Sequence, residues 1–100
     1  MTICLDMSSV AATETAFARI AAVDGDIRAF VTTLPDSARA EARASDARWA
    51  AGGSLGPLDG LPFAVKDNIA VAGLPTRCGT TAFDTPATTD ATVVTRLRAA

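Results

Sequence analysis

The sequence predicts an α/β fold, because helix-like and strand-like segments alternate along its 100 residues. Two long segments rich in alanine, residues 9–23 and 35–51, have the spacing of helices. Two short apolar runs, residues 27–32 and 62–66, contain the β-branched and aromatic side chains that are favoured in strands. We therefore expect the order helix, strand, helix, strand, loop, helix.

The first helix is expected over residues 9–23, where alanine and apolar side chains recur at helical intervals. Ser8 or Ser9 can accept a main-chain N–H group and cap its start. The turn-forming run Asp24-Gly25-Asp26 is expected to end the helix. Residues 27–32 then alternate in polarity, which predicts a short strand.

The second helix is expected to begin at Pro35, because proline is tolerated in the first helical turn, and to run to about residue 51. Gly52-Gly53 supplies the stop signal, and residues 52–57 are expected to form a flexible connector. Apart from alanine, Trp49 is the apolar residue of this helix. Charged side chains along it predict a helix exposed to water over most of its surface: Arg39, Glu41, Arg43, Asp46 and Arg48.

The second half of the chain begins with residues 62–66, an apolar run expected to form a strand buried on both faces of a mixed sheet. Thr, Gly and Pro are frequent over residues 76–89, which predicts a loop over the end of that strand. A last helix is expected to start at Thr88, Thr89 or Asp90, with Val93, Val94 and Leu97 on one side. The sequence contains no stop signal for this helix, so we expect the chain to be a fragment of a longer gene product.

The composition allows one small domain with a thin core. Alanine contributes 22 residues, and Leu, Ile, Val and Phe together contribute 22 more, which leaves little apolar surface to bury. A net charge of −2 with mixed signs argues against nucleic-acid binding and against a basic membrane-binding patch. The N-terminus lacks the charged lead and apolar run of a signal peptide, so a cytoplasmic protein without a membrane span is expected.

Neither a metal nor a cofactor is expected. Cys4 and Cys78 have no metal-ligand spacing or disulfide pattern, and the sequence has no histidine to complete a zinc site. Cys78 is expected to pack as a small side chain. The absence of histidine also excludes a Ser-His or Cys-His pair, so any catalysis here has to use carboxylates, hydroxyls or an amine.

Lys66 is the candidate catalytic residue. It is the only lysine, the other eight basic residues being arginine, and it ends the predicted apolar strand. Arginine stays protonated, whereas a desolvated lysine can lose its proton near neutral pH and act as a general base. Taken alone, the simpler interpretation is a surface lysine or one paired to a carboxylate, although the adjacent Asp67 would point to the opposite face of a strand.

The wider sequence around Lys66 resembles the amidase signature family. The run GPLDGLPFAVKDNIAVAGLPTRCGT, followed by TDATVVTRLRAA, is similar to that family's Gly-Pro-Leu start, apolar stretch, Lys-Asp-Asn, threonine turn and Asp-Ala-Thr-Val-Val helix start. The preceding ARIAAVDGDIRAFV is similar to the family's N-terminal lead-in. The resemblance covers nearly the whole chain.

The resemblance implies that residues 1–100 are the N-terminal portion of a single amidase signature domain with a mixed sheet. Residues 1–53 would form a helix-strand-helix lead-in. Residues 54–89 would form the lysine-bearing strand and loop, and residues 90–100 a truncated helix.

The resemblance also implies a Ser-cisSer-Lys hydrolase that converts carboxamides to acid and ammonia. Lys66 would take a proton from a bridging serine in a cis peptide, and that serine would activate a second serine for attack on the carbonyl carbon. Both serines would lie beyond residue 100, so this segment alone is expected to be inactive. The serines present match neither motif position: Ser8, Ser9, Ser37, Ser45 and Ser54.

Arg77 departs from the small residue common at its position in the family, which leaves the subfamily open. The alternatives are the A subunit of a glutamyl-tRNA amidotransferase, an allophanate-hydrolase-like enzyme, and a truncated non-catalytic module that binds a partner. The expected partners are a small amide substrate and, in the whole protein, a second copy of the chain or amidotransferase subunits.

Overall fold

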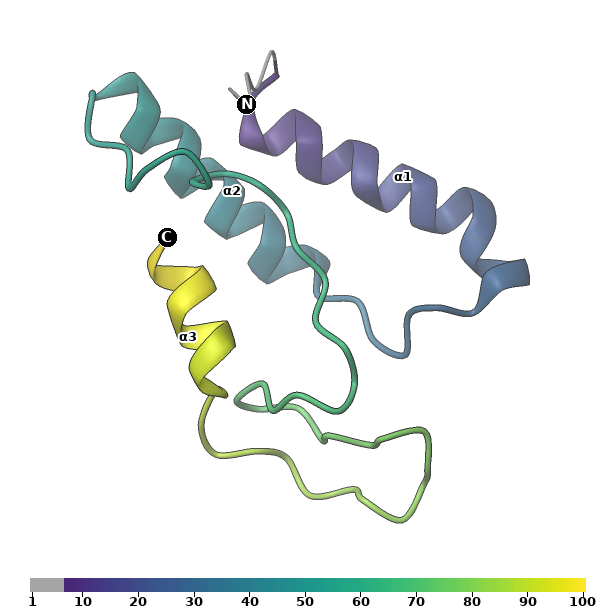
Figure 1. Ribbon diagram of the computed structural model, residues 1–100. Helices are drawn as coiled ribbons and strands as arrows, with labels where there is room; N and C mark the ends of the chain where they lie inside the picture. The colour runs from purple at the N-terminus through teal and green to yellow at the C-terminus, as the bar shows by residue number, and fades with distance from the viewer. Residues whose placement is uncertain (1–6) are drawn as a thin grey trace. The chain divides into compact units, whose positions relative to one another are not determined.

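The structure is a computed structural model that describes residues 7–100 (Figure 1). The chain divides into two compact units, Met1–Pro62 and Phe63–Ala100. The described residues form three helices: α1 (Ser9–Ile27), α2 (Pro35–Ala50) and α3 (Thr92–Ala99). The same residues form no strand, so the predicted helices are present and the predicted strands are not.

Helix α1 starts where the sequence predicts and ends later. The Ser8 hydroxyl accepts the N–H of Ala11 at 3.1 Å and caps the helix. The turn predicted at Asp24-Gly25-Asp26 is wrong, because α1 continues through these residues. The helix closes at Arg28, which adopts the left-handed conformation with φ of 54° and donates its N–H to the Asp24 carbonyl at 2.7 Å.

The strand predicted over residues 27–32 is also wrong. Ile27 is the last residue of α1. The Asp24 carboxylate then accepts the N–H groups of Ala29, at 2.7 Å, and of Phe30, at 3.4 Å. Because these two N–H groups already donate to Asp24, they are not available to pair with a neighbouring strand.

Helix α2 confirms the second predicted helix to within one residue at its end. Pro35 occupies the first turn, and Asp36 lies there too, near the positive end of the helix dipole. At the other end, Gly52 follows the C-cap residue with φ of 73°, a conformation that glycine adopts without steric cost.

Helices α1 and α2 pack side by side and run in opposite directions (Figure 1). Small side chains are buried on both helices, namely Ser9 and Thr13 of α1 and Ala42 and Ser45 of α2. Their spacing of four and three residues places each pair on one helical face. Among the described residues, only Ala42 in this unit and Val94 in the second unit are buried apolar side chains. This confirms the thin core.

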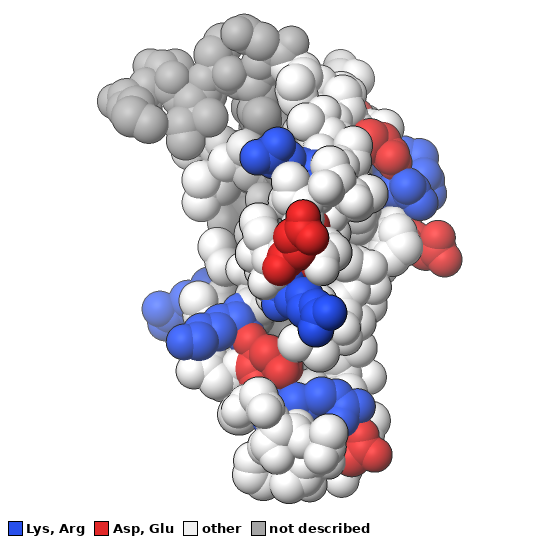
Figure 2. Space-filling view, turned by 90° about the vertical axis from the view of Figure 1, so that its right-hand side faces the viewer, with Lys and Arg blue, Asp and Glu red and all other residues white. Residues whose placement is uncertain are grey.

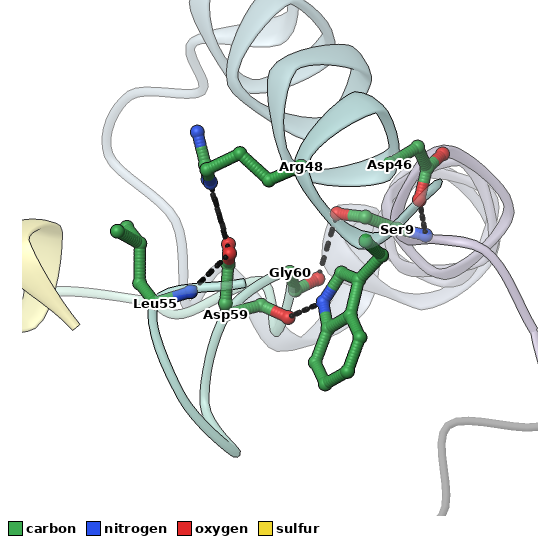
Figure 3. A network of polar contacts seen from close by, with 7 residues as sticks. Ser9, Asp46, Arg48, Leu55, Asp59 and Gly60 are labelled. Carbon is green, nitrogen blue, oxygen red and sulfur yellow. Dashed lines mark hydrogen bonds and ion pairs between the residues drawn. The ribbon is translucent and has the colours of Figure 1, made fainter. Parts of the chain in front are cut away.

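The loop after α2 folds around Asp59, which is only 3% exposed (Figure 3). Arg48 donates from Nε to Oδ2 at 2.9 Å and from Nη2 to Oδ1 at 2.6 Å. The Leu55 N–H donates to Oδ2 at 3.0 Å, and the Trp49 indole N–H donates to the Asp59 carbonyl at 2.9 Å. The bonds from Arg48 and then from Leu55 hold the pKa of Asp59 well below its ordinary value, although burial acts in the other direction.

A second carboxylate, that of Asp46, accepts hydrogen bonds from the first main-chain N–H groups of α1. Asp46 accepts the N–H of Ser9 at 2.7 Å and that of Val10 at 3.2 Å, where a helix leaves its main-chain donors unpaired. The Ser9 hydroxyl donates to the Gly60 carbonyl at 2.8 Å (Figure 3). The loop is therefore tied to both helices, through Asp59 to α2 and through Gly60 to α1.

Residues 62–66 do not form the predicted buried strand. No other described residues pair with this run in a ladder, and Phe63 is 44% exposed. A strand needs a neighbour for its main-chain N–H and C=O groups. The described residues do not supply that neighbour, and the prediction is wrong for this chain.

The unit Phe63–Ala100 contains a loop whose two ends lie side by side. The Gly73 N–H donates to the Ala87 carbonyl, and the Ala87 N–H donates to the Leu74 carbonyl, both at 2.9 Å. The Ala91 N–H donates to the Ala70 carbonyl at 2.9 Å. These bonds fix the two ends of the loop to each other directly before the last helix.

Helix α3 begins at Thr92, two residues after the latest predicted start. Asp90 lies outside the helix, where it accepts the Ala72 N–H at 2.8 Å and pairs with Arg98 at 3.3 Å. Val93, Val94 and Leu97 all lie within this helix at spacings that place them on one side, as predicted. Of the three, Val94 is buried, whereas Val93 and Leu97 are exposed.

None of the helices in the described part of the chain combines the length and the apolar character that a membrane crossing requires. Cys4 lies outside the described residues.

We expect Gly60→Ala to destabilise the protein. Gly60 has φ of +102°, and a Cβ atom there would lie 2.8 Å from the Ser45 Oγ and 3.1 Å from the Ser9 Cβ. Overpacking and a left-handed backbone together should lower the free energy of unfolding by about 2 kcal/mol or more, measured as a lower urea midpoint. Gly25→Ala is the control, because Gly25 lies inside α1 with open space around it. It should stabilise by up to about 1 kcal/mol, and equal midpoints for the two variants would contradict this account.

We expect Asp59→Asn to lower the urea midpoint at neutral pH. The folded-state pKa of Asp59 lies below its ordinary value of 3.8, so its stabilising contribution is complete above that pH and is lost as the pH falls below it. The difference in midpoint between the wild type and Asp59→Asn should be constant from about pH 7 to 5 and should shrink below pH 3.8. Asp26→Asn, which removes an exposed carboxylate, is the control. A difference independent of pH would show that the Asp59 charge does not stabilise the fold.

Candidate functional site

Lys66 opens a turn at the start of the second unit. Its carbonyl accepts the N–H of Ile69 at 3.0 Å, which closes a four-residue turn through Asp67 and Asn68. The Lys66 side chain is exposed. The predicted catalytic lysine therefore lies in a turn at the protein surface in this chain, where the sequence predicts the end of a buried strand.

A second turn, over residues 77–80, lies against the first. The Thr80 N–H donates to the Arg77 carbonyl at 3.0 Å. Its two central residues both have positive φ, 52° at Cys78 and 78° at Gly79, as a type I′ turn requires. Glycine adopts this conformation freely, whereas for cysteine it carries a steric cost.

Asp67 joins the two turns. Its Oδ1 accepts the N–H of Arg77 at 3.2 Å, and its main-chain carbonyl accepts the N–H of Cys78 at 2.9 Å. One residue of the lysine turn thus holds two consecutive amides of the second turn. In the sequence, Asp67 is indicated only as a neighbour of Lys66 that would point away from it. The sequence does not predict this role, which depends on a contact ten residues along the chain.

The two turns enclose a depression of about 330 Å³ that opens to solvent. Its lining combines an amine, a carboxylate, a carboxamide and a thiol: Lys66, Asp67, Asn68, Cys78 and Gly79. Cys78 is exposed, so the prediction of a packed side chain is wrong. The depression brings a candidate base together with groups that could donate or accept hydrogen bonds to a small polar molecule.

Arg77, the unusual residue of the second turn, does not line the depression. Its guanidinium pairs with the Asp84 carboxylate at 2.9 Å, and that carboxylate is mostly exposed to water. An exposed pair of this kind contributes little to stability.

The charges on the face shown in Figure 2 are mixed, with basic and acidic side chains interspersed and no broad patch of one sign. Among residues 7–100, no three Cys, Asp or Glu side chains gather in a way that could hold a metal ion.

Comparison with known families identifies the chain. The family profile described as Amidase matches residues 11–100, which is most of the sequence. The chain belongs to the amidase family. Lys66 and every residue that lines the depression fall within the matched segment.

Individual amidase-family relatives are similar over about three quarters or more of this chain. A protein of Chloroflexus aurantiacus, named as the A subunit of a glutamyl-tRNA(Gln) amidotransferase, is 48% identical over 98 residues, which is 95% of this chain and 20% of the relative. A protein of Mycobacterium bovis named "Putative amidase AmiA2" is 51% identical over 74 residues, 74% of this chain and 15% of the relative. The chain thus spans about a fifth or less of the length of these relatives.

The fold is similar to that of solved amidase-family chains. One solved structure is the inhibitor-bound form of a complex described as "An unexpected vestigial protein complex reveals the evolutionary origins of an s-triazine catabolic enzyme". It matches this chain with a TM-score of 0.85 at 44% identity. The match covers 94% of this chain and 21% of that chain. A second structure with the same description matches with a TM-score of 0.81 at 42% identity.

We expect the positive φ of Cys78 to limit which residues this position accepts. Cys78→Val places a β-branched side chain in the left-handed conformation and should lower the free energy of unfolding by about 1–2 kcal/mol relative to Cys78→Gly. Both variants remove the thiol, so its loss does not contribute to the difference between their urea midpoints. A Cys78→Val midpoint equal to or above that of Cys78→Gly would contradict the turn geometry.

Proposed function

We propose that residues 1–100 contribute the lysine base of an amidase that hydrolyses carboxamide C–N bonds to a carboxylic acid and ammonia. The observation that carries the proposal is the family match over residues 11–100. Within that match the only lysine, Lys66, lines a solvent-open depression beside Asp67 and Asn68.

In the proposed reaction, Lys66 takes a proton from a bridging serine, which takes one from a second serine. The second serine forms a bond to the amide carbonyl carbon, the C–N bond breaks, and the leaving nitrogen takes up the proton that Lys66 accepted, returned through the bridging serine, and departs as ammonia. Water then attacks the acyl-enzyme and releases the acid. Lysine suits this role because it can be neutral and accept a proton, which arginine in effect cannot.

We propose that the two serines come from sequence beyond residue 100. Among the described residues, no serine lines the depression that contains Lys66. The chain also covers about a fifth of the relative from Chloroflexus aurantiacus. A segment that supplies the base without the nucleophile would be inactive by itself.

A second candidate function is that of the A subunit of an amidotransferase, in which the released ammonia passes to a partner protein. The 48% identity to a relative that carries this name favours it. A similar solved chain comes from a structure described as a protein complex, which supports a partner in the assembly. Ammonia release that increases when the other amidotransferase subunits are added would favour this candidate over a free-standing amidase.

A non-catalytic binding module is the alternative outside the enzymes. Several large apolar side chains are exposed and could contact a partner, among them Phe30, Trp49, Phe63 and Phe83. The reading frame downstream of codon 100 separates the two cases. An open frame with a Gly- and Ser-rich segment supports the enzyme, and a stop codon supports the module.

We expect Lys66→Ala, in the protein that carries the whole amidase domain, to lower turnover of a simple primary amide by at least about 10²-fold, the contribution of a positioned base. Lys66→Arg should fail equally, because its guanidinium stays protonated. Ammonia release from acetamide or benzamide measures both, and residues 1–100 alone should release none.

Arg96→Ala is the control for these variants, because it removes an exposed cation on α3 that does not line the depression. It should keep wild-type turnover. Near-normal turnover in Lys66→Ala would overturn the proposed function.

A further inference from the structure

The residue next to Lys66 makes two bonds that fasten the lysine turn to the second turn. The Asp67 Oδ1 accepts the Arg77 N–H at 3.2 Å, and the Asp67 carbonyl accepts the Cys78 N–H at 2.9 Å. The Lys66 side chain is exposed and extends from the first residue of its turn. Its place in the depression is therefore set by the main chain beneath it, and that main chain is fixed by Asp67.

We propose that Asp67 is a positioning residue for Lys66, acting through the bond from its Oδ1 to the Arg77 amide. This inference rests on the proposed function, since it assigns Asp67 a part in the same reaction. A lysine has four flexible carbon atoms, so a small shift of its Cα is carried to the amine. A displacement of about 1 Å at a reacting group can cost about 10²-fold in rate.

The environment of the second carboxylate oxygen of Asp67 allows a positioning role to be distinguished from a role in proton transfer. The Asp67 Oδ2 is buried and has no hydrogen-bond partner among the described residues. Only Oδ1 therefore takes part in the contact with Arg77, and an asparagine could accept the same N–H through its own Oδ1. A carboxylate that exchanged protons with Lys66 could not be replaced by a carboxamide.

Asp67→Asn and Asp67→Glu test the proposal in the protein that carries the whole domain. Asp67→Asn keeps the acceptor in place and loses the charge, whereas Asp67→Glu keeps the charge and moves the acceptor by one methylene. With acetamide or benzamide as the probe, Asp67→Asn should keep kcat within about threefold of wild type, while Asp67→Glu loses about 10-fold or more. The KM should change by less than about threefold in both. The opposite order of kcat would overturn the positioning role.

Asp67→Ala removes the contact altogether and should lower kcat by about 10- to 100-fold. In the Lys66→Ala background it should cost less than about twofold further, because no amine is left to position. A full additional loss in the double variant would overturn the proposal, since the effect of Asp67 would then not pass through Lys66. Where Asp67→Ala does not fold, the Asn and Glu variants decide.

Asp90 provides a matched control in the same unit. Its Oδ1 also accepts a main-chain N–H, that of Ala72 at 2.8 Å, but it does not line the depression. Asp90→Ala should lower the urea midpoint and leave kcat within about twofold of wild type. A loss of kcat in Asp90→Ala equal to that in Asp67→Ala would show a general loosening of the unit and overturn the specific role.

The single variant Lys66→Ala separates failure of this inference from failure of the proposed function. Full turnover in Lys66→Ala rejects the proposed function, whatever Asp67 does. Loss of turnover in Lys66→Ala together with normal kcat in Asp67→Ala rejects only the positioning role.

Discussion

Aspartate carboxylates that accept main-chain N–H groups hold this chain in its shape. The described residues bury only two apolar side chains, Ala42 and Val94, so packing alone leaves the loops weakly fixed. Five aspartates take over that task, each by accepting at least one amide: Asp24, Asp46, Asp59, Asp67 and Asp90. Hydrogen bonds to a charged acceptor are stronger than those between neutral groups, which is why a few of them suffice.

The sequence predicted the local features of the fold and missed those that need distant partners. The capping serine of α1 and the proline that begins α2 act within one helical turn, so their effect is visible in the sequence. The strands at residues 27–32 and 62–66 were predicted from side-chain type alone, but a strand also requires a neighbour, and none of the described residues supplies one. The turn at residues 24–26 was wrongly predicted for a related reason. Asp24 next to glycine is typical of a turn, whereas here α1 continues to Ile27 and the Asp24 carboxylate accepts the N–H of Ala29 just after the helix ends.

The candidate site shows the same division. Lys66 could be singled out because it is the only lysine and lies in a characteristic motif. The exposure of Cys78 and the contact between Asp67 and the second turn could not be predicted, because both depend on how two turns ten residues apart meet. The charge run on α2 was expected to be solvated, yet Arg48 holds the buried Asp59. A single sequence does not indicate which charges in such a run find partners.

The main-chain bonds that join the two ends of the loop in the second unit determine where this region can accept inserted residues. Residues 70–74 and 87–91 are bonded to one another across the base, so the distance that the intervening chain has to span is already set. Extra residues between positions 81 and 86, where every side chain is exposed, would add little closure entropy and would disturb no bond at the base. Gene duplicates could therefore acquire new surface by lengthening this tip, while the bonds that precede the last helix are kept.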